Sequence, residues 1–420
     1  MSGKRSLINH HMRQLLDQHS VDEFSQRLQL DTEDLPRALP ATAKCTAGRA
    51  DKLWTRLNAP EAVRETLLDP TTRDQIESYS GNIENCIGSV NVPVGVVGPL
   101  RVRGFFAHGD YPVPLATSEA ALVASYHRGA RLISAAGGAR SVLLNQAVTR
   151  SPAFAFRDMI EAGRFIAWIS EQFDHLCARA NATTSHGELL DMSITAEGNH
   201  VYLNFEFSTG DASGQNMVTI ATQHAFEYIL EHSPIAPQEA YVEGNLSGDK
   251  KASAQAFTTV RGKKVSAEVI IPADLLEKHV HATPQQLVDY WRMSAVGGVL
   301  SGTIGVHGHF ANGLAALYIA TGQDAACVAE SAVGVTRFET TDDGSLYAAV
   351  TLPGIMVGTV GGGTGLPSQR ACLELMGLSG AGKSGALAEV TGALLLGGEI
   401  SIIAALAAGH FTRAHRKLAR

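Results

Sequence analysis

The stretch from residue 142 to residue 244 constrains the fold most, because its patterns of apolar residues predict strands and helices in a defined order. Alternation of apolar residues with polar or aromatic ones predicts a half-buried strand. The four apolar residues are Val201, Leu203, Phe205 and Phe207. The elements predicted around it are strands over 142–156, 189–195 and 239–242 and helices over 159–176 and 215–232. This β-α-β-β-α-β order is that of a ferredoxin-like unit. The sequence therefore predicts a small domain over 142–244.

The rest of the 420-residue chain is predicted to be rich in helices. Residues 1–60 are expected to form an N-terminal helical segment. Residues 61–141 and 245–420 are expected to form one large α+β domain that carries the small domain as an insertion. Its predicted strands cover 260–271 and 345–352. A Rossmann domain is not expected, because the glycines at 361–365 lack the GxGxxG spacing of a dinucleotide-binding turn.

Composition and charge favour a cytoplasmic protein without a nucleic-acid partner. The formal net charge is −7, and no segment resembles a basic face that reads phosphates. The N-terminus turns polar at once and shows no apolar signal core. Five scattered cysteines without a CxxC pair favour reduced thiols and no metal site: Cys45, Cys86, Cys177, Cys327 and Cys372.

Residues 294–323 contain no Asp, Glu, Lys or Arg, which raises the question of a membrane span. The stretch also holds His307, His309, Asn312 and seven glycines, a poor match to hydrocarbon. We therefore expect a buried central helix here and no membrane partner.

One motif suggests a different class of protein. Residues 377–384 satisfy the GxxxxGK[ST] pattern of a phosphate-binding loop, which would make the chain a nucleotide hydrolase. That pattern needs a buried strand before it, whereas 369–376 is helical in propensity. A glycine-rich loop between helices is the preferred interpretation.

Several polar residues lie among small neighbours, and each also has an ordinary structural explanation. Glu119 could favour a helix N-terminus electrostatically, and Asp324 could end a helix. Lys250 lies in an Asp-Lys-Lys run typical of a solvated loop. His410 and His415 could be surface residues, and Glu84 could form a structural ion pair. No single motif decides between these possibilities.

Together and in this order, seven segments resemble the hydroxymethylglutaryl-coenzyme A (HMG-CoA) reductase family. They are ENCIG (84–88), PLATSEAALVAS (114–125), GDASGQNM (210–217), GDKK (248–251), GQDAA (322–326), GTVGGGTGLPSQRACLELMG (358–377) and AALAAGH (404–410). The pattern is closer to the class of the eukaryotic and archaeal enzymes, in a soluble prokaryotic form. The resemblance covers residue 80 onward.

The resemblance implies a catalytic set of Glu119, Lys250, Asp324 and His415. Lys250 would stabilise the oxyanion formed at each of two hydride transfers. Glu119 would donate protons with a pKa raised in part by the nearby like charge of Asp324. His415 would protonate the departing coenzyme A thiolate from a flexible C-terminal flap.

The resemblance also implies substrate and cofactor contacts. The substrate-binding residues would be Glu84, Arg128, Arg131, Arg150, Asn245, Asp249 and Lys251, with Arg128 and Arg131 near coenzyme A phosphates. The cofactor-binding residues would be Thr184, Ser185, Glu188, Asp211, Asn216, Gly361, Gly362 and Gly363. The small domain would hold the nicotinamide cofactor, and a homodimer or higher homo-oligomer with shared sites is expected.

One departure from the family concerns the choice of cofactor. Members that use NADPH carry basic residues at two positions that here read Ser185 and Glu188. Without a fixed cation for the 2′-phosphate, these residues favour NADH or dual use over the NADPH that is usual in the family. The departure also leaves open the reverse reaction, degradative oxidation of mevalonate with NAD. An inactive relative with a binding role is a further alternative, although all four catalytic residue types are present.

Overall fold

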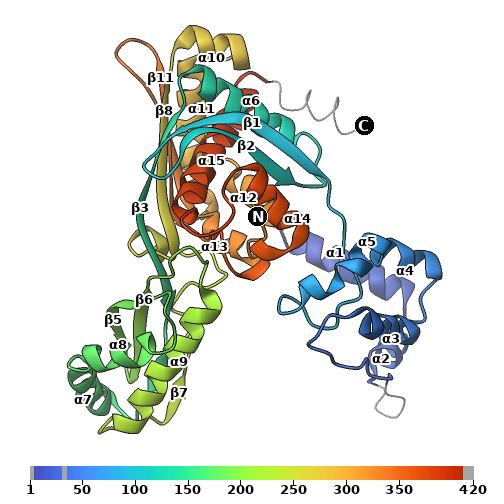
Figure 1. The fold of residues 1–420 in the computed structure, drawn as a ribbon, viewed down its shortest axis with the longest axis vertical. Coiled ribbons are helices and arrows are strands. Elements are labelled where there is room, and N and C mark those ends of the chain that lie inside the picture. Colours follow the sequence, from blue (N-terminus) through green and yellow to red (C-terminus); the bar gives the residue numbers. More distant parts are fainter. Residues whose placement is uncertain (1–3, 31–35, 410–420) are drawn as a thin grey trace. The chain divides into compact units, whose positions relative to one another are not determined.

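The computed structural model describes residues 4–30 and 36–409, which divide into two compact units, Met1–Ser89 and Val90–Arg420 (Figure 1). The helices of the first unit are α1 (Lys4–Gln18), α2 (Val21–Leu28), α3 (Ala47–Leu57), α4 (Glu61–Leu67), α5 (Pro70–Asp74) and the 3₁₀ turn η1 (Ile76–Tyr79). The unit thus extends beyond the segment 1–60 that the sequence predicted as helical.

Helix caps and a small core define the first unit. Thr46 and Asp69 each cap a helix by accepting backbone N–H groups, and Pro70 occupies the first position of α5. The indole N–H of Trp54 donates to the carbonyl of Ile87 at 2.8 Å. Six buried residues form the core: Cys45, Ala50, Trp54, Leu68, Ile76 and Cys86.

A mixed sheet forms the centre of the second unit. Its strands are β1 (Val94–Arg103), β2 (His108–Ala116), β3 (Ala139–Arg150), β8 (Gly262–Ile271), β9 (Gly305–Val306), β10 (Gly334–Thr340) and β11 (Leu346–Ile355). The order is β2-β1-β3-β8-β11-β10-β9, in which β1–β3 and β9–β10 are parallel and the other pairs antiparallel. The predicted strands over 260–271 and 345–352 are confirmed as β8 and β11, and the fold is α+β.

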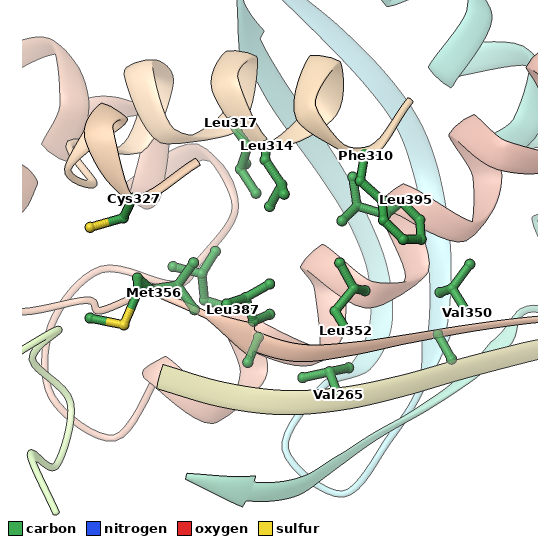
Figure 2. Packing of buried hydrophobic residues seen from close by; sticks show 14 of the residues in the cluster. Val265, Phe310, Leu314, Leu317, Cys327, Val350, Leu352, Met356, Leu387 and Leu395 are labelled. Carbon is green, nitrogen blue, oxygen red and sulfur yellow. The ribbon is translucent and has the colours of Figure 1, made fainter. Parts of the chain in front are cut away.

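Helix α15 (Ser384–Ala407) packs on this sheet against β3, β8 and β11, and is covered by three other helices (Figure 1). These are α6 (Leu122–Ala135), α11 (Pro284–Ser301) and α12 (Phe310–Thr321). Figure 2 shows how residues of α12 and α15, such as Leu314 and Leu395, meet Val350 and Leu352 of β11. The remaining elements of this part are α10 (Ala273–Val280), η2 (Ala254–Phe257), η3 (Ala325–Cys327), α13 (Val328–Ser331), η4 (Gly362–Gly365) and α14 (Pro367–Leu375).

The prediction of one central helix over 294–323 is wrong. Gly302, at φ 75°, ends α11 in the left-handed conformation, and β9 separates it from α12. In the part of the chain that the structure describes, one helix is long and apolar enough to cross a membrane, namely α15, with a mean hydropathy of 1.9. Because 83% of that stretch is buried inside the structure, it matches the core helix of a globular fold.

A second sheet continues from the first through β3, whose end pairs with β6. Its other elements are β4 (Ala153–Ala155), α7 (Met159–Ile169), α8 (Phe173–Asn181), β5 (Leu189–Glu197), β6 (His200–Phe207), α9 (Gln215–His232) and β7 (Glu239–Tyr241). The strand order is β7-β4-β6-β5, antiparallel throughout. The predicted elements between 142 and 242 are therefore present, with the predicted helix over 159–176 divided into α7 and α8.

Candidate active site

Two residues of the proposed catalytic set meet in the structure. The ammonium of Lys250, in the loop after β7, lies 3.1 Å from a carboxylate oxygen of Asp324. Asp324 caps the turn η3 by accepting the N–H of Ala326. The hydrogen bond to Asp324 raises the pKa of Lys250, so the ammonium form is favoured. Both side chains remain partly exposed, at 46% and 40%, as a site that must admit a substrate requires.

Asp249, beside Lys250, is held between two arginines. Its carboxylate accepts from Arg150 at 3.0 Å and from Arg261 at 2.5 Å. Burial raises the pKa of Asp249, but the two guanidinium groups outweigh burial and leave the pKa below its ordinary value. Asp249 is therefore an ionised anchor. Lys251 also belongs to this loop, and its ammonium donates to the carbonyl of Asp249 at 3.0 Å.

Two buried charged residues that no sequence motif contained, Arg261 and Glu330, also belong to this cluster. The Arg261 guanidinium lies 3.1 Å from Glu330, and both side chains are 5% exposed. The carboxylate of Glu330 also accepts the backbone N–H of Lys250. Burial raises the pKa of Glu330, although Arg261 opposes this shift. These residues lie far apart in the chain, so no local pattern could have identified them.

Glu119 is not joined to this cluster by a hydrogen bond or ion pair in the described part of the second unit. Glu119 lies exposed in the turn between β2 and α6, where its backbone N–H donates to the Thr117 hydroxyl at 3.0 Å. Glu84 is exposed and belongs to the first unit, and Asn245 is exposed in the loop before Lys250. His415 and its rival His410 lie outside the described residues.

Asp211, in the loop between β6 and α9, binds the loop 377–384 that matches the phosphate-binding pattern. Its carboxylate accepts the backbone N–H groups of Gly382 at 2.7 Å and Ser384 at 3.1 Å. Burial raises the pKa of Asp211, but these bonds outweigh burial and lower it. The N–H groups that would bind a phosphate thus already hold a carboxylate. In addition, the helix α14 precedes this loop instead of a strand, as the sequence analysis expected, which argues against a nucleotide hydrolase.

Three glycine-rich loops converge near Asp211. The backbone of Gly358 passes so close to the 211–213 segment that a Cβ on it would lie 2.6 Å from the nitrogen of Ser213. A Cβ on Gly322 would lie 2.2 Å from the carbonyl oxygen of Gly363. These contacts require glycine and bring the loop of Asp324 beside the loop of Gly361–Gly363. Asn216, in the first turn of α9, and the glycines Gly361 and Gly362 are exposed.

The loop between α8 and β5 carries the remaining predicted cofactor residues. The Thr184 hydroxyl accepts the N–H of His186 at 3.1 Å, and the N–H of Glu188 donates to the Ser208 hydroxyl at 3.0 Å. Ser185 and Glu188 are exposed. The segment 183–188 contains no lysine or arginine.

A cavity of 510 Å³ is lined by the two arginines expected near coenzyme A, together with histidines: Val96, Val123, Ala124, His127, Arg128, Arg131 and His279. Arg131 is exposed. Arg128 instead bonds to the hydroxyl and carbonyl of Ser401 in α15, at 2.8 and 3.0 Å. Among residues 4–30 and 36–409, no group of three potential metal ligands is present, and the five cysteines are free thiols.

Comparison with known proteins places these residues in a family. The sequence profile described as hydroxymethylglutaryl-coenzyme A reductase matches residues 52–420. A 3-hydroxy-3-methylglutaryl-coenzyme A reductase of Pyrococcus horikoshii is 42% identical over 355 residues, which cover 83% of this chain and 86% of that relative. The protein of the same name from Aeropyrum pernix is 40% identical over 406 residues, covering 92% of this chain and 96% of the relative.

Among solved structures, the chain resembles a class II 3-hydroxy-3-methylglutaryl-CoA reductase from Streptococcus pneumoniae bound to NADPH in open conformations. The TM-score is 0.64 at 19% identity, with 86% of this chain and 96% of that chain covered. At this identity the likeness concerns the fold alone. The profile match and the two archaeal relatives cover most of the chain, and the motifs named from the sequence lie within the matched range. The chain therefore belongs to the hydroxymethylglutaryl-coenzyme A reductase family.

Proposed function

We propose that this chain reduces (S)-HMG-CoA to (R)-mevalonate, consuming two NAD(P)H and two protons and releasing coenzyme A as the free thiol. The observation that carries the proposal is the ion pair between Lys250 and Asp324, which joins the GDKK and GQDAA motifs at a partly exposed site. The product is a precursor for isoprenoid synthesis.

Lys250 is the electrophilic group in this proposal. Each hydride addition to the thioester or aldehyde carbon places negative charge on the carbonyl oxygen, and an ammonium within hydrogen-bond distance stabilises that charge. Because the pKa of Lys250 is raised by its bond to Asp324, the group stays protonated at neutral pH. NAD(P)H supplies the hydride at each step.

Glu119 and His415 are the proposed proton donors. Glu119 would protonate the oxygen that Lys250 stabilises, and His415 would protonate the sulfur of coenzyme A when the carbon–sulfur bond breaks. Arg150, Asp249, Lys251, Asn245 and Glu84 are the proposed contacts of the hydroxymethylglutaryl part. Arg128 and Arg131 are the proposed partners of the coenzyme A phosphates. Arg131 is the exposed member of this pair, whereas Arg128 is bonded to Ser401.

We infer that the unit over 142–244 is an inserted ferredoxin-like domain that binds the nicotinamide cofactor, within the large domain of the second unit. Residues 61–89, which the sequence assigned to the large domain, belong to the first unit. The strand order β7-β4-β6-β5 supports the ferredoxin-like assignment. Exposed Asn216, Gly361 and Gly362 near Asp211 would line the cofactor, with Thr184, Ser185 and Glu188 near the adenosine ribose. The absence of lysine and arginine from 183–188 favours NADH or dual use.

We also propose a cytoplasmic homo-oligomer with sites shared between subunits. The C-terminal half of α11 leaves four large apolar side chains exposed: Met293, Val296, Val299 and Leu300. This face lies beside a 480 Å³ cavity lined largely by small and apolar residues of α11 and the loop after it. A second copy of the chain is the occupant that the family resemblance implies.

The decisive experiment measures oxidation of NADPH and, separately, NADH at 340 nm with added HMG-CoA. We expect oxidation that depends on HMG-CoA, with kcat reduced by at least about a hundredfold in Lys250→Ala. Lys383→Ala is the matched control, because this exposed lysine belongs to the phosphate-loop pattern; it should leave the rate nearly unchanged. The ratio of kcat/KM values determines the cofactor, and rates in both directions test degradative oxidation. A folded, oligomeric protein that oxidises neither NADPH nor NADH in the presence of HMG-CoA would contradict the proposal.

A further inference from the structure

The backbone of Lys250 adopts a conformation that side-chain-bearing residues rarely take. Its φ is 57°, in the left-handed region, and Gly248, two positions earlier, also has a positive φ of 73°. Such a conformation persists in a non-glycine residue only when its surroundings hold it firmly. The groups that hold Lys250 therefore determine where its ammonium lies.

Glu330 holds the backbone of Lys250. One oxygen of its carboxylate accepts the backbone N–H of Lys250, and the other accepts from Nε of Arg261 at 3.1 Å. Both Glu330 and Arg261 are buried. An ion pair in this environment is screened little by water and is geometrically well defined.

Arg261 fixes the preceding residue at the same time. Its other nitrogens donate to the carboxylate of Asp249 at 2.5 Å and to the carbonyl of Thr149 in β3 at 2.6 Å. Two consecutive loop residues, Asp249 and Lys250, are thus attached to one buried guanidinium–carboxylate pair.

The segment from Asp324 to Ser331 contacts Lys250 at both ends. Asp324 binds the ammonium and Glu330, six positions later in α13, binds the backbone N–H. The segment is itself fixed, because the hydroxyl of Ser331 accepts from Tyr318 at 2.9 Å and from the N–H of Met356 at 3.2 Å. Two carboxylates of one fixed segment therefore bind Lys250, one at its ammonium and the other at its backbone N–H.

We propose that Glu330 and Arg261 are positioning residues for the reaction, which keep Lys250 left-handed and its ammonium beside Asp324. This inference rests on the proposed role of Lys250. The inference assigns a function to a buried pair that is not among the residues proposed to contact substrate or cofactor. Without the Glu330 carboxylate, the N–H of Lys250 has no anchor, and the loop relaxes toward ordinary backbone conformations.

The test compares Glu330→Ala and Glu330→Gln with a control at another buried carboxylate. Glu389 is fully buried and accepts the backbone N–H groups of Phe106 and Ala107 at 2.9 and 2.7 Å, in the turn between β1 and β2. Glu389→Gln therefore changes a buried carboxylate that also binds backbone N–H groups but has no contact with Lys250. For each variant, kcat, both KM values and Tm are measured on the oligomer.

We expect kcat to fall by about a hundredfold in Glu330→Ala, the size of effect that misplacement of a reacting group produces. The KM for NAD(P)H should be unchanged. Glu330→Gln retains an oxygen that can accept the Lys250 N–H, so it should recover about tenfold of this loss, because it keeps one of the two bonds. Glu389→Gln should lower Tm while kcat stays within about twofold of the unmodified protein.

Two results separate failure of this inference from failure of the proposed function. If Lys250→Ala retains activity, the proposed function of Lys250 is wrong. If Lys250→Ala is inactive but Glu330→Ala keeps its kcat, or loses kcat only in proportion to Tm as Glu389→Gln does, the positioning role is wrong. If Glu330→Ala fails to fold, the kcat values of Glu330→Gln and Arg261→Lys test the positioning role. Their loss of kcat is compared with their loss of Tm in the same way.

Discussion

Lys263 is a buried lysine close to the candidate cofactor site. Its side chain is 3% exposed, and its ammonium donates to the carbonyl of Val357 at 3.2 Å. Burial lowers the pKa of Lys263 to about 8, although the charge of Asp211 opposes this shift. The folded protein thus bears a cost for keeping this group protonated at neutral pH.

We expect the unfolding free energy to rise with pH because Lys263 loses its proton in the folded state first. Below pH 8 both states carry the proton and the folded state bears the full cost of the buried charge. Between pH 8 and about 10.5 the unfolded chain binds more protons, so stability increases by up to about 3 kcal/mol. Denaturant unfolding from pH 7 to 10.5 should show this rise relative to Lys263→Met, which lacks the group. A difference between the two proteins that is independent of pH would contradict the expectation.

The pairing of the two central charged residues was predictable from the sequence because family motifs contain both of them. Lys250 and Asp324 were named together, and the structure joins them at 3.1 Å. Arg261 and Glu330 stood in no motif, and their significance comes from contacts with Asp249 and Lys250 across long sequence separations. Burial of a charged pair is a tertiary property, so no reading of neighbours along the chain could have found it.

At the scale of elements, periodicity determined what could be predicted. The strand β6 and the helix α9 (Gln215–His232) appeared where the period-2 and helical patterns predicted them. The hairpin β1–β2 and the strand β10 were not predicted. The uncharged stretch 294–323 has no clear period, because glycines and apolar residues occur throughout it. Its division by Gly302 depends on a left-handed backbone that composition does not reveal.

The start of α15 supplies a prediction at this scale. The Asp211 carboxylate accepts two backbone N–H groups at this end, where negative charge is also favoured by the helix dipole. Asp211→Asn should lower the unfolding free energy by about 1–3 kcal/mol, because the amide loses the charge and turns a donor toward N–H groups. Because the pKa of Asp211 is lowered, this contribution is present at neutral pH and disappears only in acid.

Thermal unfolding of Asp211→Asn without ligands measures the effect. Lys383→Ala provides the comparison, since Lys383 lies in the same loop, is exposed and should leave Tm within about one degree. Equal Tm values for both variants and the unmodified chain would show that Asp211 does not stabilise the loop.

At the scale of the whole molecule, the exposed face of α11 predicts assembly. Val299 and Leu300 are 76% and 82% exposed, which is unusual for large apolar side chains unless a partner covers them. Replacing both with glutamate should convert the proposed oligomer to monomers and reduce activity by at least about tenfold, because charges in an apolar interface remain unpaired.

Analytical ultracentrifugation and the 340 nm assay measure these two effects together. Leu375→Glu, at an exposed leucine of α14, is the matched control and should leave both unchanged. A double variant that remains oligomeric would show that α11 does not form the interface, and an active monomer would show that the sites are not shared.

The central position of α15 has a consequence for biosynthesis. This helix packs on β3, β8 and β11, yet it is translated after all of them. While the ribosome still holds residues 384–407, the growing chain exposes the sheet face that α15 covers. Glu389 and Glu399 must also reach backbone N–H groups of turns made long before. The second unit therefore closes late in synthesis, and nascent chains stalled before α15 should be preferred clients of chaperones that bind exposed apolar surface.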